Sequence, residues 1–225
     1  MKYPLTALPL VCAALSACTS PLTVTPTTGG QQPAAPVTRI EGQVPPRVVD
    51  VTAQVGNLRS AGTVTPPAPD ANGTVNPSAL ATFAVPLPSA PEDAALTRFY
   101  ELFSAPNCKQ AVTGNLLARL HLLSVLGSTN GPLVSVNATQ QGGVTTGRTQ
   151  VAYLYADRST YLRGTVTCPV AGAQQLTGFE LNVQAGWNRV VVSQGVDGAG
   201  AGRLYATAPR VTGGNAAPEV WSTAP

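Results

Sequence analysis

Side chains that could carry chemistry are scarce in this 225-residue sequence. It contains four cysteines, one histidine (His121) and ten acidic residues, of which only Glu92 and Asp93 are adjacent. A general base needs a nucleophile and an orienting partner within reach, whereas the neighbours of His121 are Leu120 and Leu122. We therefore interpret His121 as a structural or surface residue, and we expect no catalytic residue, cofactor or metal site.

The amino-terminal segment has the pattern of a secretory signal. Lys2 is followed by an uncharged, mostly apolar stretch, PLTALPLVCAALSA, that ends just before Cys18. An apolar run of roughly 7 to 15 residues behind a positive start is typical of export signals, whereas a membrane-spanning helix needs about 20. From Thr19 the chain is polar and rich in proline. We expect residues 1–17 to be a signal peptide and residues 18–37 to form an extended tether.

The last four residues of this pattern resemble the lipobox of bacterial lipoproteins: Leu15, Ser16, Ala17 and Cys18. The resemblance implies cleavage before Cys18, a diacylglycerol on its thiol and a further acyl chain, such as palmitate, on its amino group. Two or more acyl chains anchor a protein stably in a membrane. A lipid-anchored protein of the cell envelope is therefore implied, and the non-acidic Thr19 implies the outer membrane. The alternative is a secreted protein cleaved at another small-residue site.

Two cysteines remain once Cys12 leaves with the signal and Cys18 is acylated: Cys108 and Cys168. Thiols of exported proteins commonly pair, so we predict a disulfide that closes a 61-residue loop and links the region after a helix to a strand. The alternative is a pair of metal ligands. These two cysteines have neither the Cys-x-x-Cys spacing nor the nearby histidine that is common in zinc sites.

The composition favours strands and turns. There are 22 glycines and 21 prolines, and charged residues make up only 10% of the chain, against about 25% in typical domains. Without residues 1–17 the chain keeps 12 basic and 10 acidic residues. A net charge this small gives no strong attraction to nucleic acid, so we expect no nucleic-acid partner.

Alternating apolar residues predict strands at 39–44, 50–58 and 81–88, with a loop at 59–79. These pieces resemble the β-sandwich of transthyretin-like, carboxypeptidase-regulatory modules, which implies the same architecture here. The matching residues are Ile40, Gly42, Val44, Phe83, Val85, Leu87 and Pro88.

One helix is predicted in SAPEDAALTRFYELFSAPN, with Ser89 as N-cap, Glu92 and Asp93 in the first turn and Pro106 at its end. An apolar stripe at helical spacing would cover a sheet, with a partner-binding face as the alternative. The stripe contains Leu96, Phe99, Tyr100 and Phe103. The leucine run at 114–127 fits both periods, and we interpret it as a strand.

Two hairpins are predicted in the last third. A three-residue loop at 157–159 would place Leu154 opposite Leu162 and Tyr155 opposite Tyr161, with the leucines facing the core. Three tyrosines would then share the other face, either as an exposed binding patch or covered by a second layer: Tyr153, Tyr155 and Tyr161.

The second hairpin would turn at Ala185 and Gly186, setting Leu181 opposite Val190 and Phe179 opposite Val192. Those two apolar pairs would form a buried face. A last strand, GRLYATA, precedes a frayed tail at 211–225 that holds Trp221. The motifs YxYAD, GTVTC and GWN in this third resemble uncharacterised exported lipoproteins of Deinococcus-like bacteria, a resemblance that implies no activity.

The sequence thus predicts a mainly β fold: an antiparallel β-sandwich domain with one short α-helix at 38–210, after a signal peptide and tether. We expect a membrane-anchored envelope lipoprotein with a non-catalytic binding, scaffolding or structural role, whose partner is a cell-wall glycan or an envelope protein. The alternative is a carrier that holds a small hydrophobic ligand or lipid in a pocket of the sandwich. A hydrolase site built from distant residues is a weaker alternative.

Overall fold

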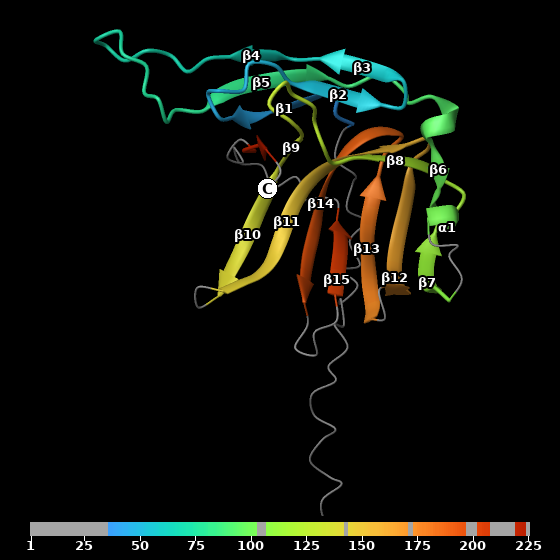
Figure 1. Ribbon diagram of the computed structural model, residues 1–225. Helices are drawn as coiled ribbons and strands as arrows, with labels where there is room; N and C mark the ends of the chain where they lie inside the picture. Colours follow the sequence, from blue (N-terminus) through green and yellow to red (C-terminus); the bar gives the residue numbers. More distant parts are fainter. Residues whose placement is uncertain are drawn as a thin grey trace, which may run out of the picture. The chain divides into compact units, whose positions relative to one another are not determined.

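The computed structural model describes residues 36–102, 107–141, 144–170, 173–196, 202–207 and 219–223. These residues form mostly antiparallel sheets and one short α-helix (Figure 1). The predicted fold class, mainly β with a sandwich-like packing of sheets, is confirmed.

A small sheet is built from the amino-terminal strands. Its order is β1 (Arg39–Val44), β5 (Ala81–Pro86) and β4 (Thr63–Thr65), all antiparallel. Beside it lies a hairpin of β2 (Thr52–Val55) and β3 (Leu58–Ala61). The predicted strands at 39–44 and 81–88 are therefore present, and the strand predicted at 50–58 is shortened to β2, because a turn and the start of β3 follow it. The predicted 59–79 loop is wrong at its start, because β4 and most of β3 fall within it.

The large sheet contains nine strands within the described part of the chain. Eight follow one another in the order β6 (Thr97–Arg98), β8 (Arg119–Leu123), β11 (Val144–Ala156), β14 (Gly186–Val196), β15 (Gly202–Thr207), β13 (Ala173–Val183), β12 (Thr160–Val170) and β7 (Lys109–Gly114). The ninth, β10 (Val136–Gln141), pairs with the first half of β11. A two-stranded ladder of β9 (Leu133–Val134) and β16 (Ser222–Thr223) completes the set.

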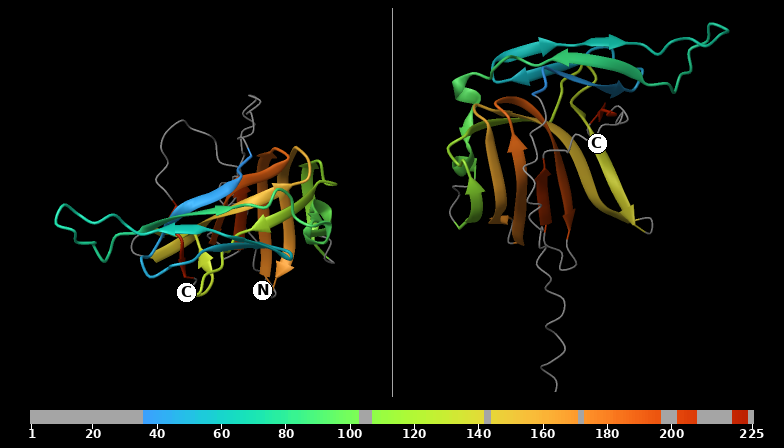
Figure 2. Two further views of the ribbon diagram at one scale, coloured as in Figure 1. Left: turned by 90° about the horizontal axis from the view of Figure 1, so that it is seen from above. Right: turned by 180° about the vertical axis from the view of Figure 1, so that it is seen from behind.

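Two hydrophobic cores hold these sheets. The sheet–sheet core joins side chains of the small sheet and β2 to one face of the large sheet, and it includes Ile40, Val55, Val85, Tyr153, Trp187 and Trp221. The inner core lies on the other face and includes Phe99, Leu120, Leu154, Leu162, Phe179 and Leu181. Figures 1 and 2 show the small sheet lying across one end of the large one.

Strand β11 contributes to both cores because successive side chains of a strand point to opposite faces. Val151 and Tyr153 belong to the sheet–sheet core, whereas Ala152, Leu154 and Ala156 belong to the inner core. The long central strand therefore couples the two layers.

The predicted hairpin of β11 and β12 is wrong. Residues 157–159 connect the two strands as expected, but β11 pairs with β8, β10 and β14, whereas β12 pairs with β13 and β7. Leu154 lies opposite Leu122 and Asn188, and Leu162 lies opposite Leu181. Leu154 and Leu162 nevertheless both belong to the inner core. The predicted facing of these leucines is right, although their predicted pairing is not.

The second predicted hairpin is also wrong in its pairing, because β15 lies between β13 and β14. It runs parallel to β13 and antiparallel to β14, so that Ala206 lies opposite both Phe179 and Val192. Phe179 and Val192 were expected to lie directly opposite each other. Both still pack on the inner core.

The predicted helix is much shorter than expected. A 3₁₀ turn, η1 (Asp93–Ala95), is followed by strand β6 and then by the four-residue helix α1 (Phe99–Leu102). Phe99 is 1% exposed and makes an edge-on contact with Phe179, their ring centres 5.0 Å apart. It is a core residue, as predicted, but Tyr100 is partly exposed, and Phe103 lies outside the described residues.

The carboxyl-terminal segment corrects the predicted frayed tail in part. Glu219–Thr223 is docked, with Trp221 fully buried in the sheet–sheet core. The backbone of Gln43 accepts a hydrogen bond from Trp221 N (2.7 Å) and donates one to Glu219 O (2.7 Å). Residues 211–218 of the predicted tail lie outside the described ranges.

Candidate functional site

Cys18, the predicted signal peptide and nearly all of the predicted tether lie outside the described residues, which begin at Pro36. Val37, the last residue of the predicted tether, donates its backbone N–H to Trp187 O (2.8 Å). Strand β1 begins two residues later.

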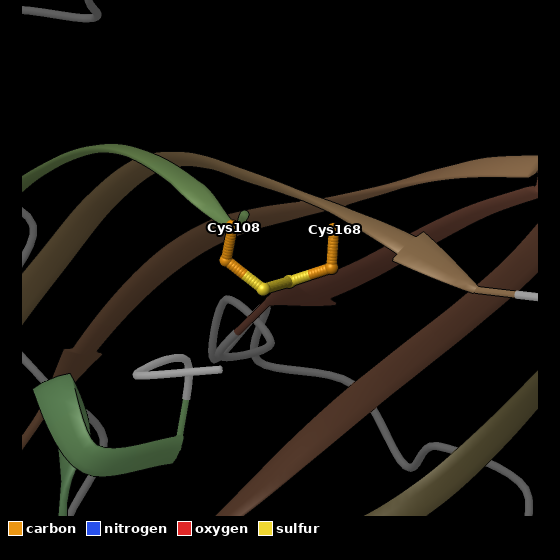
Figure 3. The surroundings of a disulfide bond; sticks show 2 residues. All are labelled: Cys108 and Cys168. Carbon is orange, nitrogen blue, oxygen red and sulfur yellow. A yellow bond between two sulfur atoms is a disulfide. The ribbon is translucent and has the colours of Figure 1, made fainter. Parts of the chain in front are cut away.

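Cys108 and Cys168 form the predicted disulfide (Figure 3). Cys168 belongs to β12, and Cys108 directly precedes β7. Because Lys109 lies opposite Thr167 in this antiparallel pair, the two cysteines occupy the next facing positions, with 4.3 Å between their Cα atoms. The link was predicted to join a helix region to a strand. It joins two neighbouring strands instead and fastens β7, the last strand in the order of the large sheet.

The three candidate tyrosines do not share one exposed face. Tyr153 is 4% exposed within the sheet–sheet core, and Tyr155 is half-buried against the Trp187 ring, with ring centres 5.4 Å apart. Only Tyr161 is well exposed, at 59%. Of the two alternatives, the exposed binding patch is therefore wrong, and the covered face is right for Tyr153 and Tyr155. The small sheet is the second layer that covers Tyr153 and Tyr155.

His121 is held between neighbours. Its Nδ1 lies 2.9 Å from Ala95 O, and its ring meets that of Trp187 edge-on at 6.1 Å. His121 therefore lies on β8 between the η1 turn and the sheet–sheet core, and its contacts are those of a structural residue.

A surface cleft of about 400 Å³ is lined by three arginines and one leucine: Arg98, Leu117, Arg119 and Arg158. We call it the arginine cleft. Arg98 and Arg119 lie opposite each other on β6 and β8, and Arg158 comes from the loop between β11 and β12. Leu117, in the turn before β8, is 62% exposed. Guanidinium groups with an apolar neighbour suit an anionic group carried on an apolar body.

Asp157 holds two of these arginines in place. Arg158 donates from Nε to Oδ1 (3.1 Å) and from Nη2 to Oδ2 (2.9 Å), and Arg119 donates from Nε to Oδ2 (3.1 Å). Asp157 Oδ1 also accepts the backbone N–H of Arg119 (3.0 Å). The hydrogen bonds from Arg158 and Arg119 outweigh burial and lower the pKa of Asp157 to about 2. Asp157 is therefore a carboxylate at neutral pH.

The remaining charges lie at the edge of the cleft. Arg119 Nη1 donates to Asp93 Oδ1 (2.9 Å), and Arg98 Nη1 donates to the hydroxyl of Tyr100 (3.2 Å) and lies 3.6 Å from Glu101 Oε1. Asp93 was expected to stabilise a helix start, and it pairs with a cleft arginine instead.

Sequence reasoning missed this cleft. One signal was Arg119, a single cation inside the leucine run LLARLHLL, which needs a carboxylate partner if its strand is half-buried. The adjacent pair Asp157 and Arg158 in a three-residue loop was another. Their meeting depends on β8 pairing with the end of β11, which periodicity does not specify.

Two further findings bear on function. Within the described ranges, no three side chains of Cys, His, Asp or Glu come together as metal ligands, and no helix there has the length and apolarity to span a bilayer. Comparison with known proteins gives no match to a family model, to a curated protein or to a solved structure.

Proposed function

We propose that this chain is a lipid-anchored protein of the cell envelope, with the outer membrane as its site, and that its folded part has a non-catalytic binding role. The amino-terminal pattern that ends in Leu15, Ser16, Ala17 and Cys18 supports the anchor. The acyl chains on Cys18 would hold the β-fold near the membrane surface on the tether at 18–37.

The Cys108–Cys168 disulfide is the observation that carries export. Disulfides persist in oxidising compartments such as the periplasm and the cell surface, and they are rare in the reducing cytosol. The pairing agrees with the signal pattern, which was recognised from entirely different residues.

The arginine cleft supports a binding role. Arg98, Arg119 and Arg158 line this cleft beside a single leucine, and guanidinium groups are strong donors to carboxylates and other anions. A cell-wall component or an envelope protein that presents an anionic group fits this lining.

Replacement of the anchor residue tests the proposal. Cys18→Ala should abolish labelling by a palmitate analogue and shift the protein from the membrane fraction to the soluble or unprocessed fraction. Cys12→Ala, which removes a thiol inside the signal peptide but leaves the lipobox intact, should behave like the parent. Equal retention of Cys18→Ala and parent in membranes after high-salt and alkaline washes would show that the anchor is wrong.

A further inference from the structure

We propose that the arginine cleft binds the free carboxylate of a peptide that ends in a small apolar residue, an inference that rests on the binding role proposed above. The cleft offers two adjacent guanidinium groups fixed on one carboxylate, donor atoms left over on each of them, and an exposed leucine beside them.

The donor atoms are oriented before a ligand arrives. Asp157 accepts hydrogen bonds from Nε and Nη2 of Arg158 and from Nε of Arg119. Asp93 accepts one from Nη1 of Arg119. These hydrogen bonds leave Arg119 Nη2 and Arg158 Nη1 without a partner among the residues that the structure describes. Since their side chains are already held, little further conformational entropy is lost when a carboxylate accepts from both.

The charges around the cleft are balanced. Its three arginines are accompanied by Asp93, Glu101 and Asp157. The formal charges therefore balance, which gives no long-range attraction for any anion. Binding of a carboxylate then rests on short-range hydrogen bonds from the guanidinium groups. The side chain of Asp157 is only 9% exposed, so a ligand in the cleft meets the guanidinium groups before it meets that carboxylate.

The size and lining of the cleft indicate that the carboxylate belongs to a larger group. A volume of about 400 Å³ falls within the range of roughly 300 to 1,000 Å³ found for small-molecule sites. Leu117 supplies apolar surface next to the arginines. The last residue of a peptide, with its free carboxylate and a small apolar side chain, meets both requirements.

The test is an NMR titration of the purified chain, as the cell produces it, with N-acetyl-alanyl-alanine and with the C-terminal amide of the same dipeptide. The acid should shift the arginine Nε–H signals and the backbone signals of residues 117–119 and 157–159, and the amide at equal concentration should not. Arg158→Lys, which keeps the charge but loses the planar fork, should weaken binding of the acid roughly tenfold.

Arg148→Gln is the matched control, because Arg148 is an exposed arginine of β11 outside the lining of the cleft; it should bind like the parent. Arg98→Gln, at a half-exposed side chain, provides a second weakened variant if Arg158→Lys does not fold. Equal shifts with acid and amide, no shift with the acid, or equal binding by the parent and the cleft variants would overturn the proposal. So would stronger binding of inorganic phosphate than of the acid. None of these outcomes affects the fractionation of Cys18→Ala, so the anchor and the cleft are judged separately.

Discussion

Trp221 packs directly on Gly42, joining the end of the chain to its first strand. A Cβ at Gly42 would lie 2.9 Å from Trp221 Cδ1 and 2.7 Å from Glu219 O. The absence of a side chain in the middle of β1 is therefore what lets the segment 219–223 dock against the small sheet, where the Trp221 ring meets Phe83 edge-on at 6.3 Å.

Gly42→Ala should accordingly destabilise the fold. The added methyl group meets backbone as well as the indole, and overpacking of this kind costs about 1–3 kcal/mol. Chemical denaturation followed by tryptophan fluorescence measures the loss. Glu41→Ala, at the exposed neighbouring position of β1, should change the free energy of unfolding by no more than about 0.5 kcal/mol. A Gly42→Ala variant as stable as the parent would contradict the close contact between Gly42 and Trp221.

Much of the fold can be predicted from local sequence. The contact between Trp221 and Gly42 cannot, because it joins residues far apart in the chain. Alternation correctly located β1, β2 and β5 and the inward facing of Leu154 and Leu162, because a strand's period fixes which face each side chain takes. It does not fix which strand lies alongside. Several strands with the same alternation satisfied the same local rules, so β15 could lie between β13 and β14 without any signal in either strand.

The end of the chain was misjudged for a related reason. Trp221 stands among small and polar residues with no apolar period around it, so the tail was expected to be frayed. It is buried because Gly42, roughly 180 positions earlier in the sequence, leaves room for it. The arginine cleft is similarly non-local, since its four lining residues come from β6, β8, the turn before β8 and the loop after β11. The disulfide could be predicted because only two candidate cysteines remained.

Single substitutions of two tyrosines should separate core from surface. Tyr153→Ser removes a ring that is 4% exposed in the sheet–sheet core and should cost about 3–5 kcal/mol. Tyr161→Ser removes a ring that is 59% exposed and should change the free energy of unfolding by about 0.5 kcal/mol or less. Denaturant midpoints of the two variants provide the comparison. Similar losses in both would show that Tyr161 is covered in solution.

The disulfide should stabilise the whole fold, with the clearest local effect at β7. A link between residues 60 positions apart contributes roughly 4 kcal/mol in the chain-entropy description. The double variant Cys108→Ser/Cys168→Ser should therefore melt at a lower temperature. Amides of Lys109–Gly114 should lose the most protection from hydrogen exchange, because β7 is the last strand in the order of the large sheet. Two titratable thiols in the oxidised native protein would contradict the link.

Asp157 should make stability depend on pH in the acid range. Its pKa is lowered from 3.8 to about 2 by hydrogen bonds from Arg158 and Arg119, so the unfolded chain binds a proton at this residue more readily than the folded one. The resulting stabilisation is fully present above about pH 4 and is lost as the pH falls toward 2. It amounts to at most about 2 kcal/mol, since both donating side chains, Arg119 and Arg158, are partly exposed.

Asp157→Asn should therefore lower the free energy of unfolding at pH 7 and flatten its dependence on pH between 4 and 2. Urea denaturation at a series of pH values measures both effects. Arg148→Gln also changes the net charge by one but leaves this network intact, so it should retain the parent's slope. If Asp157→Asn loses stability between pH 4 and 2 as steeply as the parent does, other carboxylates govern acid unfolding. The hydrogen bonds of Asp157 would then serve only to position Arg119 and Arg158.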